Sequence, residues 1–192
     1  MSAPLRSESF SLDEYFALER VSERRFEYRE GEIVCMSGGS VEHAAIARNI
    51  VSHLVTKVRG GSCRVYGSDL AVYVPGGHPY RYPDASVVCG ETSLQRIDGR
   101  DCLENPVLLV EVLSPSSADY DRGTKFEEYK SISAFAEYLL VAQDRPHAAR
   151  RTRRDRNTWH ETAFDSLNTA IHLETIGVSL DMREVYEGMS FK

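Results

Sequence analysis

The chain lacks any long apolar segment. No uninterrupted hydrophobic run among its 192 residues approaches the roughly 18 residues that a membrane-spanning helix needs. We therefore expect no membrane partner. Residues 1–9 contain no apolar stretch followed by a small-residue cleavage site, so the sequence gives no support for secretion. A cytoplasmic location is the expectation that follows.

Cysteine is scarce, and several catalytic motifs are missing. The four cysteines, Cys35, Cys63, Cys89 and Cys102, include no C-x-x-C pair and no histidine at zinc-finger spacing. We expect reduced, mostly buried thiols rather than a disulfide framework or a zinc site. The sequence also has no G-x-G-x-x-G, G-x-x-x-x-G-K-[ST], H-E-x-x-H or G-x-S-x-G motif. Dinucleotide-binding, P-loop, zincin and α/β-hydrolase functions therefore lack support.

Positive charge is also in deficit. The chain has 23 Lys and Arg against 29 Asp and Glu, a net charge of -6, which argues against broad electrostatic attraction to nucleic acid. One segment, residues 145–156, departs from this balance with six arginines and one aspartate. This segment is either a solvated hairpin rim or an edge that faces phosphates. In the second case the nucleic-acid contacts would come from Arg150, Arg151, Arg153 and Arg154.

Length and composition are those of an ordinary globular domain. Apolar residues make up 42% of the chain and charged residues 27%. A chain of this size can bury one substantial core, so we expect a single domain over residues 1–192 with its core at about 40–142. The fold class that the pattern predicts is mixed α/β (α+β).

The periodicity predicts a core of one helix, three strands, a second helix and a fourth strand. A polar connection is expected from Gly90 to Asn105. Outside the core, a capping box at Ser11 and Glu14 predicts an N-terminal helix over about 12–20, and a hairpin around Gly31 follows it. Weaker alternation predicts a C-terminal β extension with a final short helix or turn. The predicted core elements and extension strands are 41–59, 63–74 with an interruption near Gly67 and Ser68, 84–89, 107–113, 119–132, 138–141, 147–152, 158–164 and 170–173.

Two carboxylates within apolar segments are the main chemical signal. Glu111 lies in the middle of the apolar run 106–113, and Asp84 opens the preceding apolar strand. Burying a charge is costly unless a partner compensates it, and one divalent cation can serve two carboxylates on neighbouring strands. Oxygen ligands favour Mg²⁺ or Mn²⁺ over zinc. The alternative is an aspartate that caps a turn and a glutamate that pairs with a core cation.

Four further residues are candidates around this pair. Lys125, at the start of the predicted second helix, could return toward the carboxylates, orient a water or offset charge on a phosphate, or simply pair with Asp121 at i−4. Tyr129 could support Lys125 from the same face or belong to the core. Glu27 lies between two aromatic residues of a strand, so it is expected to face solvent. His43, in the first turn of the long helix, could face a phosphate or act as acid or base.

In combination, several segments resemble the PD-(D/E)XK nuclease superfamily and, more closely, its Uma-two family of restriction-endonuclease-like proteins. The resemblance covers roughly residues 12–188. It implies a restriction-endonuclease-like fold and Mg²⁺- or Mn²⁺-dependent hydrolysis of DNA, with Asp84, Glu111 and the backbone carbonyl of Val112 as metal ligands. A homodimer would allow both strands to be cut. The segments that establish the resemblance are Arg25–Tyr28 with Gly31 and Glu32, Tyr82–Asp84, Val110–Ser116, Asp121–Lys125, Glu137–Val141 and Tyr186–Gly188.

One departure from the family pattern bears on activity. The superfamily's lysine falls two residues after the glutamate, where this chain has Leu113. Lys125 is the natural substitute, entering from the next helix. Three functions therefore remain open: a metal-dependent DNA endonuclease, a catalytically weak nucleic-acid- or partner-binding module that retains the fold, and a metal-dependent hydrolase of smaller phosphoesters.

Overall fold

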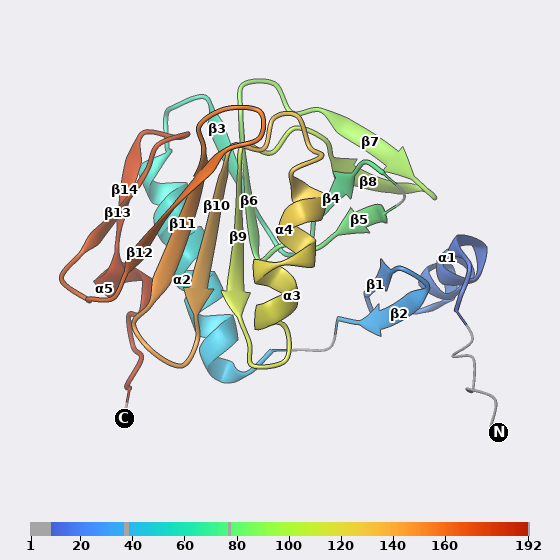
Figure 1. The fold of residues 1–192 in the computed structure, drawn as a ribbon, viewed down its shortest axis with the longest axis horizontal. Helices are drawn as coiled ribbons and strands as arrows, with labels where there is room; N and C mark the ends of the chain where they lie inside the picture. Colours follow the sequence, from blue (N-terminus) through green and yellow to red (C-terminus); the bar gives the residue numbers. More distant parts are fainter. Residues whose placement is uncertain (1–8, 37–38, 77, 192) are drawn as a thin grey trace.

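A six-stranded mixed sheet forms the centre of the molecule (Figure 1). The structure is a computed structural model that describes residues 9–36, 39–76 and 78–191. Residues 1–8, which bear on the expectation about secretion, lie outside this part. The strand order is β12-β11-β10-β9-β6-β3, and only the β9–β10 pair is parallel. The strands are β3 (Cys63–Gly67), β6 (Ala85–Cys89), β9 (Leu108–Leu113), β10 (Glu137–Ala142), β11 (Ala148–Arg153) and β12 (Trp159–Phe164).

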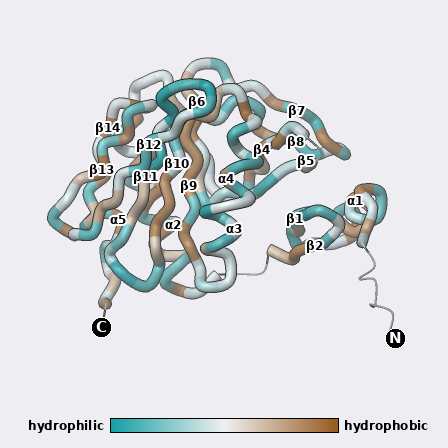
Figure 2. Tube along the Cα trace, in the orientation of Figure 1, coloured by the Kyte–Doolittle hydropathy of each residue, from teal (hydrophilic) through white to brown (hydrophobic). Residues whose placement is uncertain are grey.

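Helices cover both faces of this sheet, so its central strands are buried and are apolar apart from Glu111 in β9 and Glu137 in β10. All six residues of β9 and all six of β10 are buried, as expected for strands packed on both sides. Helix α2 (Val41–Lys57) packs its buried side chains Ile46, Ile50 and Leu54 on one face. Helices α3 (Ala118–Arg122) and α4 (Thr124–Tyr129) lie on the other (Figure 1). The brown central strands in Figure 2 show this core.

Two β extensions flank the core. The C-terminal extension consists of the hairpin β13 (Ala170–Leu173) and β14 (Val178–Asp181) and helix α5 (Met182–Val185), which join the core on the α2 side. A second sheet of order β5-β4-β8-β7 lies beside the α4 side (Figure 1). Its strands are β4 (Ala71–Val74), β5 (His78–Arg81), β7 (Leu94–Ile97) and β8 (Arg100–Leu103).

An N-terminal arm packs against the second sheet. It consists of helix α1 (Leu12–Val21) and the hairpin β1 (Phe26–Arg29) and β2 (Glu32–Cys35). The predicted capping box is present, with the Ser11 side chain accepting from the Glu14 N–H. Fully buried Tyr15 of α1 stacks near Tyr80 of β5 and donates a hydrogen bond to the Phe26 carbonyl. The arm therefore shares a small core with the second sheet.

The core has the predicted order of one helix, three strands, helix and strand, but three local predictions need correction. The expected polar connection 90–105 contains the hairpin β7–β8, which turns at Asp98 and Gly99 with positive φ at both. The expected helix 119–132 is broken at Gly123 into α3 and α4. The predicted strand 63–74 is interrupted near Gly67 and Ser68, as expected, but its two halves, β3 and β4, belong to different sheets.

The cysteine prediction also needs correction. Cys35 and Cys102 are free, but Cys63 and Cys89 form a disulfide. The two residues are direct partners in the antiparallel register of β3 and β6. Their separation of 26 residues in the sequence gives no sign of this register. Among the described residues, no helix combines the length and apolar character needed to cross a bilayer.

The packing of α2 predicts a contrast between two neighbouring residues. Leu54 is fully buried against the sheet, whereas Val55 is 40% exposed. Leu54→Ala should lower the free energy of unfolding by about 2–5 kcal/mol, because it leaves a cavity in the core. Val55→Ala should change it by about 0.5 kcal/mol or less. Urea unfolding of both variants tests this, and similar losses in the two would contradict the assigned face of α2.

Candidate active site

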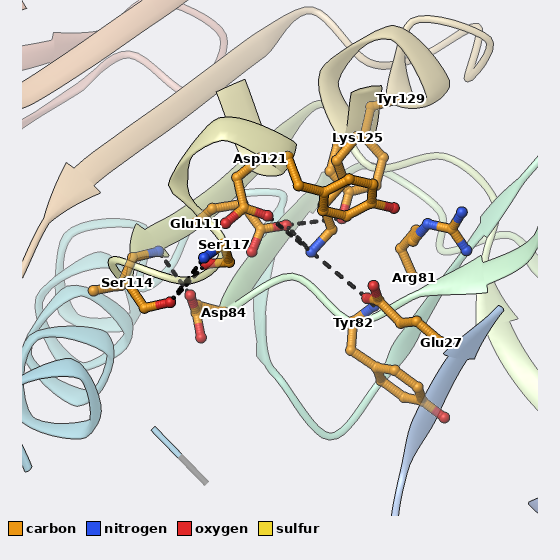
Figure 3. A network of polar contacts seen from close by, with 12 residues as sticks. Glu27, Arg81, Tyr82, Asp84, Glu111, Ser114, Ser117, Asp121, Lys125 and Tyr129 are labelled. Carbon is orange, nitrogen blue, oxygen red and sulfur yellow. Dashed lines mark hydrogen bonds and ion pairs between the residues drawn. The ribbon is translucent and has the colours of Figure 1, made fainter. Parts of the chain in front are cut away.

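The two predicted carboxylates lie on neighbouring strands at one end of the sheet. Strand β6 pairs with β9, and the register sets Ala85 opposite Val110. Asp84, immediately before β6, therefore lies next to the part of β9 that contains Glu111 and Val112. Figure 3 shows both carboxylates in one polar network with side chains from α3 and α4.

Asp84 is held on both of its oxygens. Its Oδ2 accepts a hydrogen bond from the Val112 N–H at 2.7 Å, and its Oδ1 lies 2.9 Å from Nε2 of His43. His43 lies in the first turn of α2, where Ser40 caps the helix by accepting from the His43 N–H. The hydrogen bond to Asp84 raises the pKa of His43 above its usual value. His43 thus contacts the carboxylate directly and fixes its orientation.

Glu111 is buried and bonded to two side chains. Its Oε1 lies 2.8 Å from the Lys125 amine and accepts a hydrogen bond from the Tyr129 hydroxyl at 2.9 Å. Burial is the main cause of a pKa well above the usual value for Glu111. The negative charges of Asp121 and Asp84 raise this pKa further, while Lys125 opposes them. Burial therefore disfavours the charged form of Glu111 more than the Lys125 ammonium favours it.

Lys125 reaches the carboxylates from α4. Its side chain is only 2% exposed, and its amine lies 3.6 Å from both Glu27 and Asp121 in addition to the 2.8 Å contact with Glu111. Burial alone would lower the pKa of Lys125, but the surrounding carboxylates raise it well above its usual value. The contact with the strand carboxylate and the i−4 pair, which the sequence left as alternatives, are both present.

The face of β9 explains how a displaced lysine can reach the site. Leu109 and Leu113 belong to the cluster of Phe126 and Tyr129, while Val110 and Val112 pack with α2 on the other face. Side chains alternate along a strand, so Glu111 and Leu113 share the face that α3 and α4 cover. Lys125 approaches from those helices over the same face.

The prediction for Glu27 was wrong. The sequence suggested a solvent-facing residue, but Glu27 is fully buried, while Phe26 and Tyr28 are half-buried on the other side of β1. Its Oε1 accepts a hydrogen bond from the Tyr82 N–H at 3.0 Å, and its Oε2 pairs with Arg29 at 2.9 Å. The strand is covered on both faces because the arm packs against β5, a contact between distant segments that local alternation does not indicate.

Two more charged residues belong to the network and were not among the predicted site residues. Asp121 of α3 is 4% exposed, and burial raises its pKa. Arg81 is fully buried, and its Nε lies 2.7 Å from Glu128. The sequence contained a signal for both residues. Asp121 precedes Lys125 by four residues and Arg81 precedes Asp84 by three, and a buried charge commonly has a compensating charge nearby.

The arginines of the 145–156 segment are bonded mainly to the protein itself. Arg150 is 8% exposed and bonds to the His172 carbonyl and to Glu174. The other three predicted contact residues also have partners. Arg151 pairs with Glu161, Arg153 donates to the Ser133 and Lys130 carbonyls, and Arg154 pairs with Glu174. The segment starts before β11 at the Asp84 end of the sheet and runs along β11, so only Arg153, Arg154 and Arg156 lie at the opposite end.

The donor set of the site fits a hydrated Mg²⁺ or Mn²⁺ ion. Within residues 9–36, 39–76 and 78–191, no three His, Cys, Asp or Glu side chains come together in a way that would hold an ion by themselves. Magnesium usually keeps several waters and takes only one or two carboxylates from the protein. Asp84 and Glu111 supply such a pair, and a bound cation would favour the charged form of Glu111, whose pKa is raised mainly by burial.

The sheet order and the acidic site define the class of this protein as restriction-endonuclease-like. The chain belongs to the Uma-two family, whose model, described as "Putative restriction endonuclease", matches residues 12–183. Two uncharacterized proteins of Synechocystis sp. are each 30% identical to it. The protein slr1290 aligns over 181 residues, 94% of this chain and 93% of its own length, and sll1609 over 130 residues, 68% and 73%.

A solved structure shares the fold. It is the crystal structure of "a putative nuclease belonging to DUF820" from Anabaena variabilis. The TM-score is 0.72 at 20% sequence identity, and the match covers 92% of this chain and 97% of the Anabaena chain. At this identity the likeness concerns the fold.

The buried Glu27 predicts a specific pH dependence of stability. Burial alone would raise the pKa of Glu27, but Lys125 and Arg81 outweigh it and hold the pKa below its ordinary value of 4.5. The charged carboxylate therefore stabilises the fold above that value, and this stability is lost as the pH falls through the folded-state pKa. Glu27→Gln should lower the free energy of unfolding at neutral pH by roughly 3–5 kcal/mol.

Chemical denaturation from neutral pH to about pH 3 measures this effect, and the gap between wild type and Glu27→Gln should narrow below 4.5. Glu32→Gln is the matched control, because Glu32 is an exposed glutamate of the same hairpin. If the difference in unfolding free energy between wild type and Glu27→Gln stays constant over the whole pH range, the substitution acts through packing and not through the loss of charge.

Proposed function

We propose that the protein is a metal-dependent endonuclease that hydrolyses phosphodiester bonds of DNA. The observation that supports this most is the convergence of Asp84 and Glu111 from neighbouring strands, with the Lys125 amine 2.8 Å from Glu111. The family description and the description of the Anabaena protein as a nuclease point to the same chemistry. The proposal includes action in the cytoplasm and a homodimer that cuts both strands.

The residues of the site have separate roles in this proposal. Asp84, Glu111 and the Val112 carbonyl would hold Mg²⁺ or Mn²⁺. When bound, such an ion lowers the pKa of a coordinated water and neutralises charge on the attacked phosphate. His43 fixes the Asp84 carboxylate through its 2.9 Å contact, and Tyr129 fixes Glu111 through its hydroxyl. Both contacts limit the rotamers that the ligands can adopt, as partners of metal ligands commonly do.

Lys125 supplies the positive charge of the site. Its raised pKa keeps the amine protonated at neutral pH, so it offers hydrogen-bond donors and cannot serve as a base. An ammonium beside the carboxylates can orient the attacking water and stabilise negative charge that builds up on the phosphate. Glu27 and Asp121 hold the amine from its other sides at 3.6 Å and prevent it from swinging away.

A second candidate function is a nucleic-acid- or partner-binding module with little catalysis. Leu113 at the usual lysine position favours it, as does the direct bonding of Lys125 to Glu111. The two functions differ in one measurable property, which is whether the purified protein breaks phosphodiester bonds.

Nicking of supercoiled plasmid in the presence of Mn²⁺ separates the two functions. We expect nicking by wild type and a decrease of at least about 100-fold in Asp84→Asn and Glu111→Gln, because each loses charge stabilisation of several kcal/mol. Lys125→Met should also lower the rate. Asp144→Asn is the control, because Asp144 is an exposed acid outside the site and should leave nicking unchanged.

Two outcomes would count against the endonuclease. If clean wild-type protein does not nick the plasmid, the binding module is favoured. If nicking is the same in wild type, Asp84→Asn and Glu111→Gln, the activity comes from a contaminant.

A further inference from the structure

A second polar hollow lies at the far end of α4 from Lys125. It has a volume of about 630 Å³ and is bounded by the segment after α4 and by the turn between β11 and β12. Register places it at the end of the sheet away from Asp84, because Thr152 pairs with Glu137 at the start of β10 (Figure 1). The residues that line it are Lys130, Ser131, Ser133, Arg153, Arg156 and Asn157.

The lining of this hollow is strongly biased in charge. It contains three cations, two hydroxyls and one amide, and no carboxylate, in a chain whose net charge is -6. The hollow beside α1 is different, because Glu19 and Asp98 balance Arg20 and Arg100 in its lining. Positive groups and neutral donors without an acid are the set that binds an oxyanion.

Arg153 gives the hollow a fixed wall. Its two Nη atoms each donate to a backbone carbonyl, of Lys130 and Ser133, at 3.1 Å, and its guanidinium lies 5.2 Å from the centre of the Trp159 ring. Arg153 Nε and Trp159 Nε1 are buried N–H groups without a hydrogen-bond partner among the described residues. Buried donors ordinarily have an acceptor, so this corner of the molecule has unused capacity for one.

Of the three cations, only Lys130 has a carboxylate partner among the described residues, and Arg153 is bonded to backbone carbonyls. Lys130 pairs with Glu127, and Asp155 accepts hydrogen bonds from the N–H groups of Asn157 and Thr158. Arg156 is exposed and has no ion pair within the part of the chain that the structure describes. Its guanidinium is therefore the group most available to a ligand.

We propose that this hollow binds a phosphate group of a nucleic-acid backbone. The choice of nucleic acid as the partner rests on the proposed function. Helix α4 has six residues and is therefore about 9 Å long. Because successive phosphates of one strand advance by about 3.4 Å along the duplex axis, a strand that passes along α4 would bring the two sites within a few nucleotides of each other. Contacts of this kind set the register of the substrate and do not select sequence.

The test is the salt dependence of DNA binding by the full chain in EDTA, where no cleavage occurs. Fluorescence anisotropy of a labelled duplex between about 50 and 200 mM salt gives the slope of log K against log salt. Arg156→Ala should reduce this slope by about 0.9, the value for one lost phosphate contact. Arg59→Ala is the control, because Arg59 is an exposed arginine after α2, on the other side of the sheet from α4 and outside the hollow, and its slope should equal that of wild type.

Trp159 provides a second measurement, because it is the only tryptophan of the chain and lies against Arg153. Its fluorescence should change on addition of a short oligonucleotide, and the change should be lost in Arg156→Ala. Inorganic phosphate alone should cause the same fluorescence change only at concentrations at least about 100-fold higher than the oligonucleotide, because a free ion makes fewer contacts than a polynucleotide.

Four results would overturn the proposal. They are the absence of DNA binding by wild type, an unchanged slope in Arg156→Ala, equal slope changes in Arg156→Ala and Arg59→Ala, and an equal fluorescence response to inorganic phosphate and oligonucleotide. Failure here is separate from failure of the endonuclease. If wild type nicks plasmid but the slope is unchanged in Arg156→Ala, the endonuclease proposal stands and the phosphate contact in the hollow is refuted. If the slope falls in Arg156→Ala but wild type does not nick plasmid, the phosphate contact stands and the endonuclease proposal fails.

Discussion

One buried ammonium among several carboxylates is the interaction on which the arrangement of this protein depends. Lys125 lies within 3.6 Å of Glu27, Glu111 and Asp121, which come from the N-terminal arm, the central sheet and α3. Removing one partner of a buried ion pair leaves an uncompensated charge, so these three parts of the fold are stable only together. Because Gly123 ends α3, α4 can start in a new direction and bring Lys125 over β9. Local helix geometry and long-range electrostatics thus serve the same contact.

The sequence indicated the elements whose signal is local or strongly periodic. The apolar runs around Glu111 and after Asp84 identified two central strands. Strands that are apolar on both faces lie in the middle of a sheet, which made it reasonable to expect these two to be neighbours. Contacts set by tertiary packing could not be predicted in the same way. Alternation in β1 placed Glu27 outside because it assumes one covered face, whereas the arm covers both. The Cys63–Cys89 disulfide depends on a register that sequence separation does not specify. The hairpin β7–β8 could have been predicted from local sequence, because Asp98-Gly99 is a turn signal. The polar character of residues 90–105 led instead to the prediction of an irregular connection.

Charge is unevenly distributed over the two ends of the main sheet. The acidic network of Asp84, Glu111 and Asp121 lies at one end, and the arginine-rich strand β11 and its turn extend to the other. The net charge of -6 conceals this separation, because it sums the two ends. An acidic end suits a cation and a basic end suits an anion, and both are present in a nucleic acid with its associated metal ions. The internal partners of Arg150 and Arg151 reduce the number of arginines that are available for such contacts.

The position of Glu27 also has a consequence for biosynthesis. Glu27 accepts a hydrogen bond from the Tyr82 N–H, which is synthesised 55 residues later, and contacts Lys125, which follows later still. An incomplete chain therefore cannot assemble the polar network, however well its individual helices form. Assembly of the network is therefore delayed until synthesis has passed Lys125, and any shorter nascent fragment lacks the ammonium that the buried carboxylates require.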